Sequence, residues 1–303
     1  MLRSYPNAGA TGAEGEDVDP DHTLDRVQRA LGGEAVMPPV AGLSFVPPAT
    51  LPGLRGDAAA SPVRSIARTC EDARLDFAFV PSWDCWAEAL VEELHERGVL
   101  AWWVVGGVLW PALEELGVEA GLHATVRAPE KLKRPMHAGL EVARSMVRRG
   151  LSLGADGIVV ADDLAGALGP IVAPDFVAAE VVPCFELLIA PARSAGVPCF
   201  LHSDGDARVF MPRVHRAGFA AVHGDCGGAD RVARALEAAS AAGLALVGGL
   251  PTSELGNPGR AVAAGTGAGV LARAGGVLLA DDGGITTSEE CAGLLAAIGA
   301  ARR

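Results

Sequence analysis

The sequence predicts a single (β/α)8 barrel, and three observations support this prediction. Short apolar segments alternate with helical segments along the whole chain of 303 residues. These segments are largely apolar along their length rather than alternating, which is typical of parallel strands that are buried on both faces. Several of them run directly into acids or a histidine, as expected for a site at the carboxyl ends of barrel strands. An open nucleotide-binding sheet is disfavoured, because no glycine-rich phosphate loop follows the first strand.

The apolar segments predict eight strands, and the third ends at a pair of glycines. We expect these strands at residues 37–46, 75–80, 99–105, 157–161, 198–201, 219–222, 244–247 and 277–280. Residues 1–35 are expected to form a flexible tail and a short helix, and residues 36–303 the barrel.

Helical periodicity fills the intervals between the strands. Residues 86–97 form the clearest amphipathic helix, and Gly98 is placed to end it. Pro183 is expected to kink the helix at 175–195 or to end its first half. Thr287 and Glu290 form a capping box, which predicts the start of the last helix. Other helices are expected at 21–31, 62–74, 137–149, 207–217 and 229–242, with two short ones before residue 137.

Composition limits the class of partner and the compartment. The formal net charge of −12 argues against a nucleic-acid partner, which would require a basic surface. The chain lacks an apolar run of about 18 residues, so we expect no membrane span. None of the six cysteines forms a C-x-x-C pair, which favours reduced, buried thiols and a cytoplasmic location. The N-terminal residues lack the apolar region of a signal peptide.

The expected strand ends bring many acids to one face of the barrel. Carboxylates that share a concave site repel one another, so each close pair raises a pKa or binds a cation. A divalent metal, a cationic or hydroxyl-rich substrate, or protonated carboxyls acting as general acids would each resolve this repulsion. A polyanionic porphyrin would be repelled. The groups expected at this face are Asp84, Asp162, Asp163, Asp204, Asp225, Asp281, Asp282, His202, His223 and Cys226.

Each of these residues also has a plain structural interpretation. Asp163 and Asp225 precede turns or helices and could cap them, whereas Asp162 is less easily explained as a cap. His202 could be a buried histidine bonded to backbone. The tryptophans are expected to pack in the core, except Trp83, which stands at a strand exit beside Asp84.

The segments ADDLAGALGPIVAPDF and FLHSDGD, which begin at Ala161 and Phe200, resemble the uroporphyrinogen decarboxylase superfamily. The closing GGITTSEE resembles it too, and the similarity spreads over about residues 35–300. The resemblance implies a (β/α)8 barrel and either tetrapyrrole decarboxylation or corrinoid-linked methyl transfer. The arginine-rich segment that holds porphyrin carboxylates is missing here. The zinc motif H-x-C-G reads His202-Ser203-Asp204-Gly205, and both cysteine positions of the metal motif have changed.

These observations favour an enzyme that transfers a methyl group to or from a small molecule, with a metal at the barrel mouth. A cofactor-free decarboxylase and a non-catalytic ligand-binding barrel remain as alternatives. The expected cofactors are a divalent metal such as zinc and a corrinoid supplied by a partner protein, and a homodimer is a further candidate assembly. We assign His202 and Asp204 to the metal, Asp84, Asp162 and Asp163 to catalysis, and Trp83, His223, Asp225 and Asp282 to substrate binding.

Overall fold

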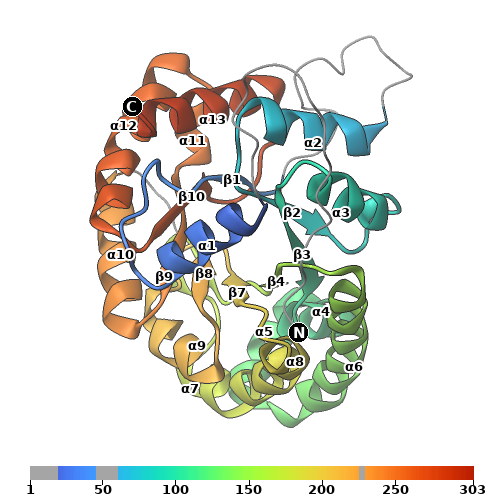
Figure 1. Cartoon of the computed structure of the whole chain (residues 1–303). Coiled ribbons are helices and arrows are strands. Elements are labelled where there is room, and N and C mark those ends of the chain that lie inside the picture. The colour runs from blue at the N-terminus through green and yellow to red at the C-terminus, as the bar shows by residue number, and fades with distance from the viewer. Residues whose placement is uncertain (1–19, 46–60, 225–228) are drawn as a thin grey trace.

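The chain folds into a barrel of eight parallel strands that is surrounded by helices (Figure 1). The computed structural model describes residues 20–45, 61–224 and 229–303. A bridge between Ala41 and Leu279 joins the first strand of the barrel to the last. The strands, in barrel order, are β1 (Gly42–Leu43), β2 (Phe77–Pro81), β3 (Leu100–Gly106), β4 (Gly157–Ala161), β7 (Cys199–His202), β8 (Ala221–His223), β9 (Ala245–Leu250) and β10 (Val277–Asp281).

The eight expected strands correspond to these eight, with small shifts at their ends. The first is much shorter than expected, because Pro38 and Pro39 have no N–H to donate to a neighbouring strand. Asp225 and Cys226, which were expected at the site, lie outside the described residues. The other five cysteines are free thiols.

Helices cover the outside of the barrel, and a buried apolar layer separates them from the strands. Their bounds are α1 (Pro20–Leu31), α2 (Pro62–Asp72), α3 (Ala87–His95), α4 (Leu109–Leu116), α5 (Val118–Arg127), α6 (Glu130–Leu153), α7 (Pro174–Phe176), α8 (Val182–Ser194), α9 (Met211–Ala217), α10 (Ala229–Ala242), α11 (Thr252–Leu255), α12 (Pro258–Ala274) and α13 (Ser288–Ala301). In the described part of the chain, no helix has the length and apolar character that crossing a bilayer demands.

Local signals in the sequence explain how several helices begin. The capping box is present at α13: Thr287 accepts the N–H of Glu290, whose carboxylate accepts the N–H of Thr287. A single π-helical turn, Val177–Val181, precedes Pro183, so the helix continues past the proline. The wider turn accommodates the missing N–H and the bulk of the ring.

Two features were not expected from the sequence. Helix α6 begins seven residues before the expected start at 137, because its buried face extends back through Pro135 to Leu132. A short antiparallel hairpin, β5 (Ala165–Gly166) and β6 (Gly169–Pro170), follows β4 at the carboxyl face.

Aromatic rings fill the inside of the barrel. The indole of Trp102 stacks between the rings of Phe77 and Phe200, with centroid distances of 3.8 and 4.3 Å. Helix α1 packs Val27 and Ala30 against this inner core and so covers the amino ends of the strands. The amino end of the barrel is thus covered, whereas a cavity opens at the carboxyl end.

A buried ionic cluster fixes α1 and the C-terminus to the amino end of the barrel. The Asp76 carboxylate accepts bonds from Arg26 of α1 at 3.2 Å and from Arg302 after α13 at 2.7 Å. It also accepts the N–H of Ala41 at 2.9 Å, next to the bridge that closes the barrel. Removing this carboxylate would leave two buried guanidinium groups without their anion.

We therefore expect Asp76→Ala to lower the free energy of unfolding by about 3–5 kcal/mol. Asp72→Ala is the matched control, because that carboxylate is exposed and forms only a 3.8 Å ion pair with Arg68 on the same helix. The control should change stability by no more than about 0.5 kcal/mol. Urea unfolding followed by circular dichroism measures both, and equal losses in the two variants would contradict this role of Asp76.

Candidate active site

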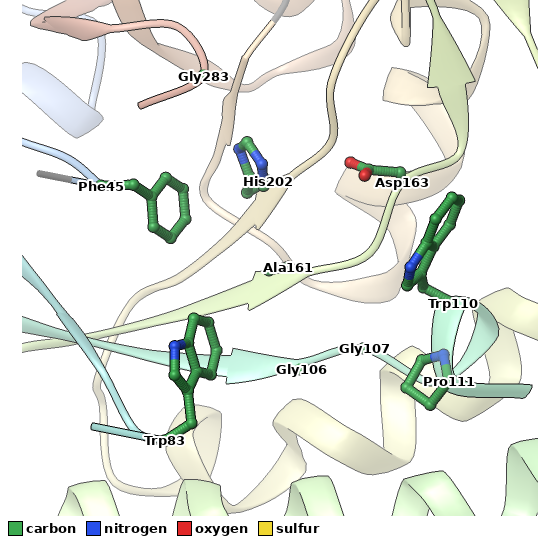
Figure 2. A pocket seen from close by; sticks show the side chains of 10 residues that line it. All are labelled: Phe45, Trp83, Gly106, Gly107, Trp110, Pro111, Ala161, Asp163, His202 and Gly283. Atoms are coloured by element: carbon green, nitrogen blue, oxygen red, sulfur yellow. The ribbon is translucent and has the colours of Figure 1, made fainter. Parts of the chain in front are cut away.

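A cavity of about 320 Å³ opens at the carboxyl ends of the strands. Figure 2 shows Phe45 and Trp83 on one side, Trp110 and Pro111 on the other, and His202 and Asp163 between them. The remaining lining residues, Gly106, Gly107, Ala161 and Gly283, have small side chains or none. The cavity thus combines aromatic walls with one histidine and one carboxylate.

Two buried histidines and a backbone carbonyl form a hydrogen-bonded chain beneath the cavity. His202 Nδ1 lies 2.8 Å from His223 Nδ1, and His223 Nε2 lies 2.8 Å from the carbonyl oxygen of Asp281. A carbonyl oxygen can only accept, so His223 Nε2 carries a hydrogen. In a neutral ring, His223 Nδ1 is then the acceptor and His202 Nδ1 the donor. The second nitrogen of His202, Nε2, is consequently left with a lone pair.

Burial keeps both rings neutral. Desolvation lowers the pKa of His202 well below 6.5, and the neighbouring His223 lowers it further. Desolvation also lowers the pKa of His223 to about 4. At neutral pH the chain of hydrogen bonds therefore has a defined direction, from His202 through His223 to the Asp281 carbonyl.

The ring of His202 lies beside two carboxylates. Oxygens of Asp163 and Asp204 and a ring nitrogen of His202 lie within 4.8 Å of one another. The distance from His202 Nε2 to Asp204 Oδ1 is 3.6 Å. Asp163 also accepts the N–H of Asp204 at 2.8 Å, which fixes the loop after β7 to the end of β4.

This group has the donor chemistry of a divalent metal site. Partial burial raises the pKa of Asp204 to about 6, and the charges of Asp163 and Asp282 contribute to the increase. Two ionised carboxylates at this distance repel each other, and a cation bound between them stabilises their ionised form. Because the Asp204 side chain is 59% exposed, it can turn toward an ion bound to His202 Nε2. One nitrogen and two oxygens suit zinc, manganese or ferrous iron, and they leave further coordination positions open.

Asp162, next in sequence to Asp163, points away from this group and into the protein. Its carboxylate accepts the N–H groups of Val108, Leu109 and Trp110, each at 2.8 Å, at the start of α4. Asp162 is 1% exposed, and burial raises its pKa to about 6 although the three N–H groups act in the opposite direction. The sequence suggested a capping role for Asp163 rather than Asp162, and this expectation was wrong.

The cap formed by Asp162 depends on Gly107. A Cβ atom at Gly107 would stand 2.1 Å from the carboxyl carbon of Asp162, so only glycine leaves room for the carboxylate. The cap places Trp110 and Pro111, in the first turn of α4, at the wall of the cavity. Asp162 thus positions the cavity wall, and a direct part in catalysis remains a prediction.

The other predicted residues lie around the cavity at different depths. Trp83 lines it and is 60% exposed. Burial raises the pKa of Asp84, which lies beside Trp83 but is not a lining residue. Asp282 accepts the N–H and the hydroxyl of Thr252 with one carboxylate oxygen, Oδ1. His223 contacts His202 rather than the cavity.

Sequence reasoning missed two contributors to the cavity wall. Trp110 was expected to pack in the core, although its place just after a strand that ends in Gly106-Gly107 is a signal for the barrel mouth. Phe45 follows β1, and its ring lies 4.8 Å from that of His202. These two residues are far apart in the chain, so the sequence alone gives no indication of their contact.

Comparisons with known proteins support the fold. No protein-family model matches the chain, and no curated protein matches its sequence. A methyltransferase from Methanosarcina mazei is 16% identical, with a TM-score of 0.68 over 92% of this chain and 98% of that one. A B12-independent methionine synthase from Shewanella sp. W3-18-1, solved with selenomethionine, is 10% identical, with a TM-score of 0.57 over 87% and 95%.

A third similar structure belongs to another class of enzyme. A D-psicose 3-epimerase from Clostridium cellulolyticum H10, solved with D-tagatose, is 11% identical, with a TM-score of 0.51 over 86% of this chain and 98% of that one. At such identities the similarity shows a shared barrel fold. The function must be argued from the site itself.

The two neighbouring carboxylates should respond differently to mutation. Asp162→Ala leaves three buried N–H groups without an acceptor, so we expect it to lower the free energy of unfolding by about 2–4 kcal/mol. Asp163→Ala removes one N–H bond at the cavity edge and should cost less than about 1 kcal/mol. Thermal and urea unfolding of both variants measures the difference, and a larger loss for Asp163→Ala would reverse this assignment.

The tautomers of the two histidines can be observed directly. In metal-free protein at pH 6.5, we expect ¹⁵N NMR to show a hydrogen on Nδ1 of His202 and on Nε2 of His223. Both rings should stay neutral at pH 6, where half or more of an ordinary histidine is protonated. An imidazolium signal from either ring at that pH, or an N–H on Nε2 of His202, would contradict the inferred chain.

Proposed function

We propose that this barrel is a metal-dependent enzyme that transfers a methyl group between a donor and a small-molecule acceptor at its carboxyl face. The observation that carries the proposal is that a ring nitrogen of His202 and oxygens of Asp163 and Asp204 lie within 4.8 Å of one another, while the hydrogen-bonded chain leaves His202 Nε2 with a lone pair. The Methanosarcina mazei methyltransferase and the Shewanella methionine synthase share the barrel and suggest this class of reaction.

The described residues fit a divalent cation, with zinc as the first candidate. His202 would supply the nitrogen ligand, and Asp163 and Asp204 would supply oxygen ligands. When bound, a divalent cation supplies Lewis-acid chemistry, which lowers the pKa of a thiol or a water molecule. The donor set differs from the thiolate centre of corrinoid-linked methyltransferases, because an aspartate stands at the position of the motif's first cysteine.

The protein's own groups then have separate tasks. His223 holds the ring of His202 in one tautomer and orientation, as the outer hydrogen bond of a metal-binding histidine commonly does. Asp162 holds the start of α4, and with it Trp110, against the site. The aromatic walls exclude water from one side of the acceptor, which strengthens electrostatic interactions in the cavity.

The methyl donor would be a corrinoid carried by a partner protein, as the sequence resemblance implies. A decarboxylase that acts on porphyrins is less favoured, because no lysine or arginine lines the cavity within the described ranges. Such a polyanionic substrate would meet Asp163 and Asp204 without a compensating cation.

Metal binding tests the first half of the proposal. We expect purified protein, stripped with a chelator, to bind one equivalent of zinc or cobalt(II). His202→Ala and Asp204→Ala should each weaken binding at least tenfold. His123→Ala is the control, since that histidine is exposed on α5 and distant in sequence from the three proposed ligands. Equal zinc affinity for the His202 variant and the wild type would refute the site.

Methyl transfer is tested with the metal-loaded protein, methylcobalamin and a set of small thiols. We expect mass spectrometry to detect a methyl thioether and the spectrum of cob(I)alamin to appear in equal amount. Loss of the reaction on chelation and in His202→Ala is the expected pattern. If neither the chelator nor the His202→Ala substitution slowed the reaction, the proposed metal centre would have no role in methyl transfer.

A further inference from the structure

We infer that the cavity binds a methylated onium group, such as the head of a quaternary ammonium or a sulfonium compound, through the faces of Trp83, Trp110 and Phe45. This inference deepens the proposed function, because it names the class of the methylated small molecule: the onium is the product when the corrinoid donates its methyl group, and the donor when cob(I)alamin accepts one. It rests on that proposal in one respect, which is that the cavity beside the metal group is the substrate site.

The first argument is the composition of the walls. Three aromatic rings from separate segments, after β1, after β2 and in α4, surround the space in front of His202 (Figure 2). A cation within about 6 Å of an aromatic centroid is attracted to the face of the ring, and tryptophan attracts it most strongly. Several rings around one space form the kind of cage that recognises quaternary ammonium groups.

The second argument is the exposure of Trp83. Its side chain is 60% exposed, whereas Trp102 and Trp103 are fully buried. The indole lies over the open cavity in Figure 2, so its position is not explained by packing in the core. Burying such a ring against a ligand would recover a large apolar area.

The third argument is charge. Asp163 lines the cavity and Asp204 lies beside it, while no lysine or arginine lines it in the described part of the chain. The indole N–H of Trp110 donates to the carboxylate of Glu114 at 3.1 Å, and this bond to an anion increases the electron density of the ring. With the metal group empty, the field in the cavity therefore favours a cation.

The fourth argument is the space available. The volume of about 320 Å³ is at the lower end of the range for small-molecule pockets, roughly 300–1,000 Å³. A Cβ atom at Gly106 would meet no other atom within 4 Å, so the floor beside Trp83 is open. A compact head group fits this space.

Choline and its neutral isostere 3,3-dimethylbutan-1-ol, in which carbon replaces the charged nitrogen, separate charge recognition from simple apolar burial. We expect calorimetry on the full chain, with chelator present, to show choline binding at least tenfold more tightly than the isostere. Trp83→Ala should weaken choline binding at least fivefold, and Trp83→Phe should restore most of it. Equal affinity for the two probes, or no effect of Trp83→Ala, would overturn the inference.

A second variant blocks the cavity without touching a ring or a metal ligand. Gly106→Leu places a side chain in the open floor, where its backbone angles require no glycine, and it should abolish choline binding. Leu168→Ala is the control, because that side chain is fully exposed on the β5–β6 hairpin and should leave binding unchanged. Choline binding by Gly106→Leu at the wild-type affinity would also overturn the inference.

The zinc titration is repeated on the same samples so that the two proposals can fail separately. Zinc binding without discrimination between choline and its isostere overturns the onium inference alone. Discrimination without zinc binding overturns the metal centre and leaves the onium site standing.

Discussion

The hydrogen-bonded chain from His202 through His223 to the carbonyl of Asp281 is the constraint on which the site depends. Its direction is set by a simple rule, namely that a carbonyl oxygen cannot donate. Because burial keeps both rings neutral, this rule determines the position of each hydrogen along the chain. The result is a nitrogen lone pair at the bottom of the cavity, held in place by groups that never touch the ligand.

Neighbouring carboxylates at the end of β4 have opposite environments. Asp162 satisfies three amide groups at the start of α4, and Asp163 faces the cavity and the loop after β7. Successive side chains of an extended segment point to opposite sides, so a pair of acids at a strand end can serve structure and chemistry at once. The barrel uses one of them to position Trp110 and the other to place a charge beside His202.

The sequence predicted the barrel well because its signal is local and repeated. Buried parallel strands are largely apolar along their length, and the Thr287 capping box lies within four residues. The site was predicted less completely, because its geometry depends on long-range contacts. Whether Asp162 or Asp163 caps a helix depends on the space beside Gly107, which follows a different strand, β3. The contact between Phe45 and His202 joins residues 157 positions apart, and periodicity does not encode such a contact.

A metal motif that has lost its cysteines can still supply metal ligands. His202 remains at the strand end, and Asp204 stands where the zinc motif of the similar family has a cysteine, with Asp163 near both. Hard oxygen donors would shift the preference among metals and leave the geometry of the barrel mouth unchanged. The aromatic walls and acidic character of the cavity are consistent with a cationic substrate at such a centre.

Anomalous X-ray diffraction at the zinc edge, from crystals of the metal-loaded protein, tests the central claim most directly. We expect one anomalous peak at about 2.0–2.1 Å from Nε2 of His202, with oxygens of Asp163 and Asp204 completing the protein ligands. A zinc ion bound through Nδ1 of His202, or bound elsewhere in the barrel with His202 unliganded, would contradict the arrangement derived from the buried histidine chain.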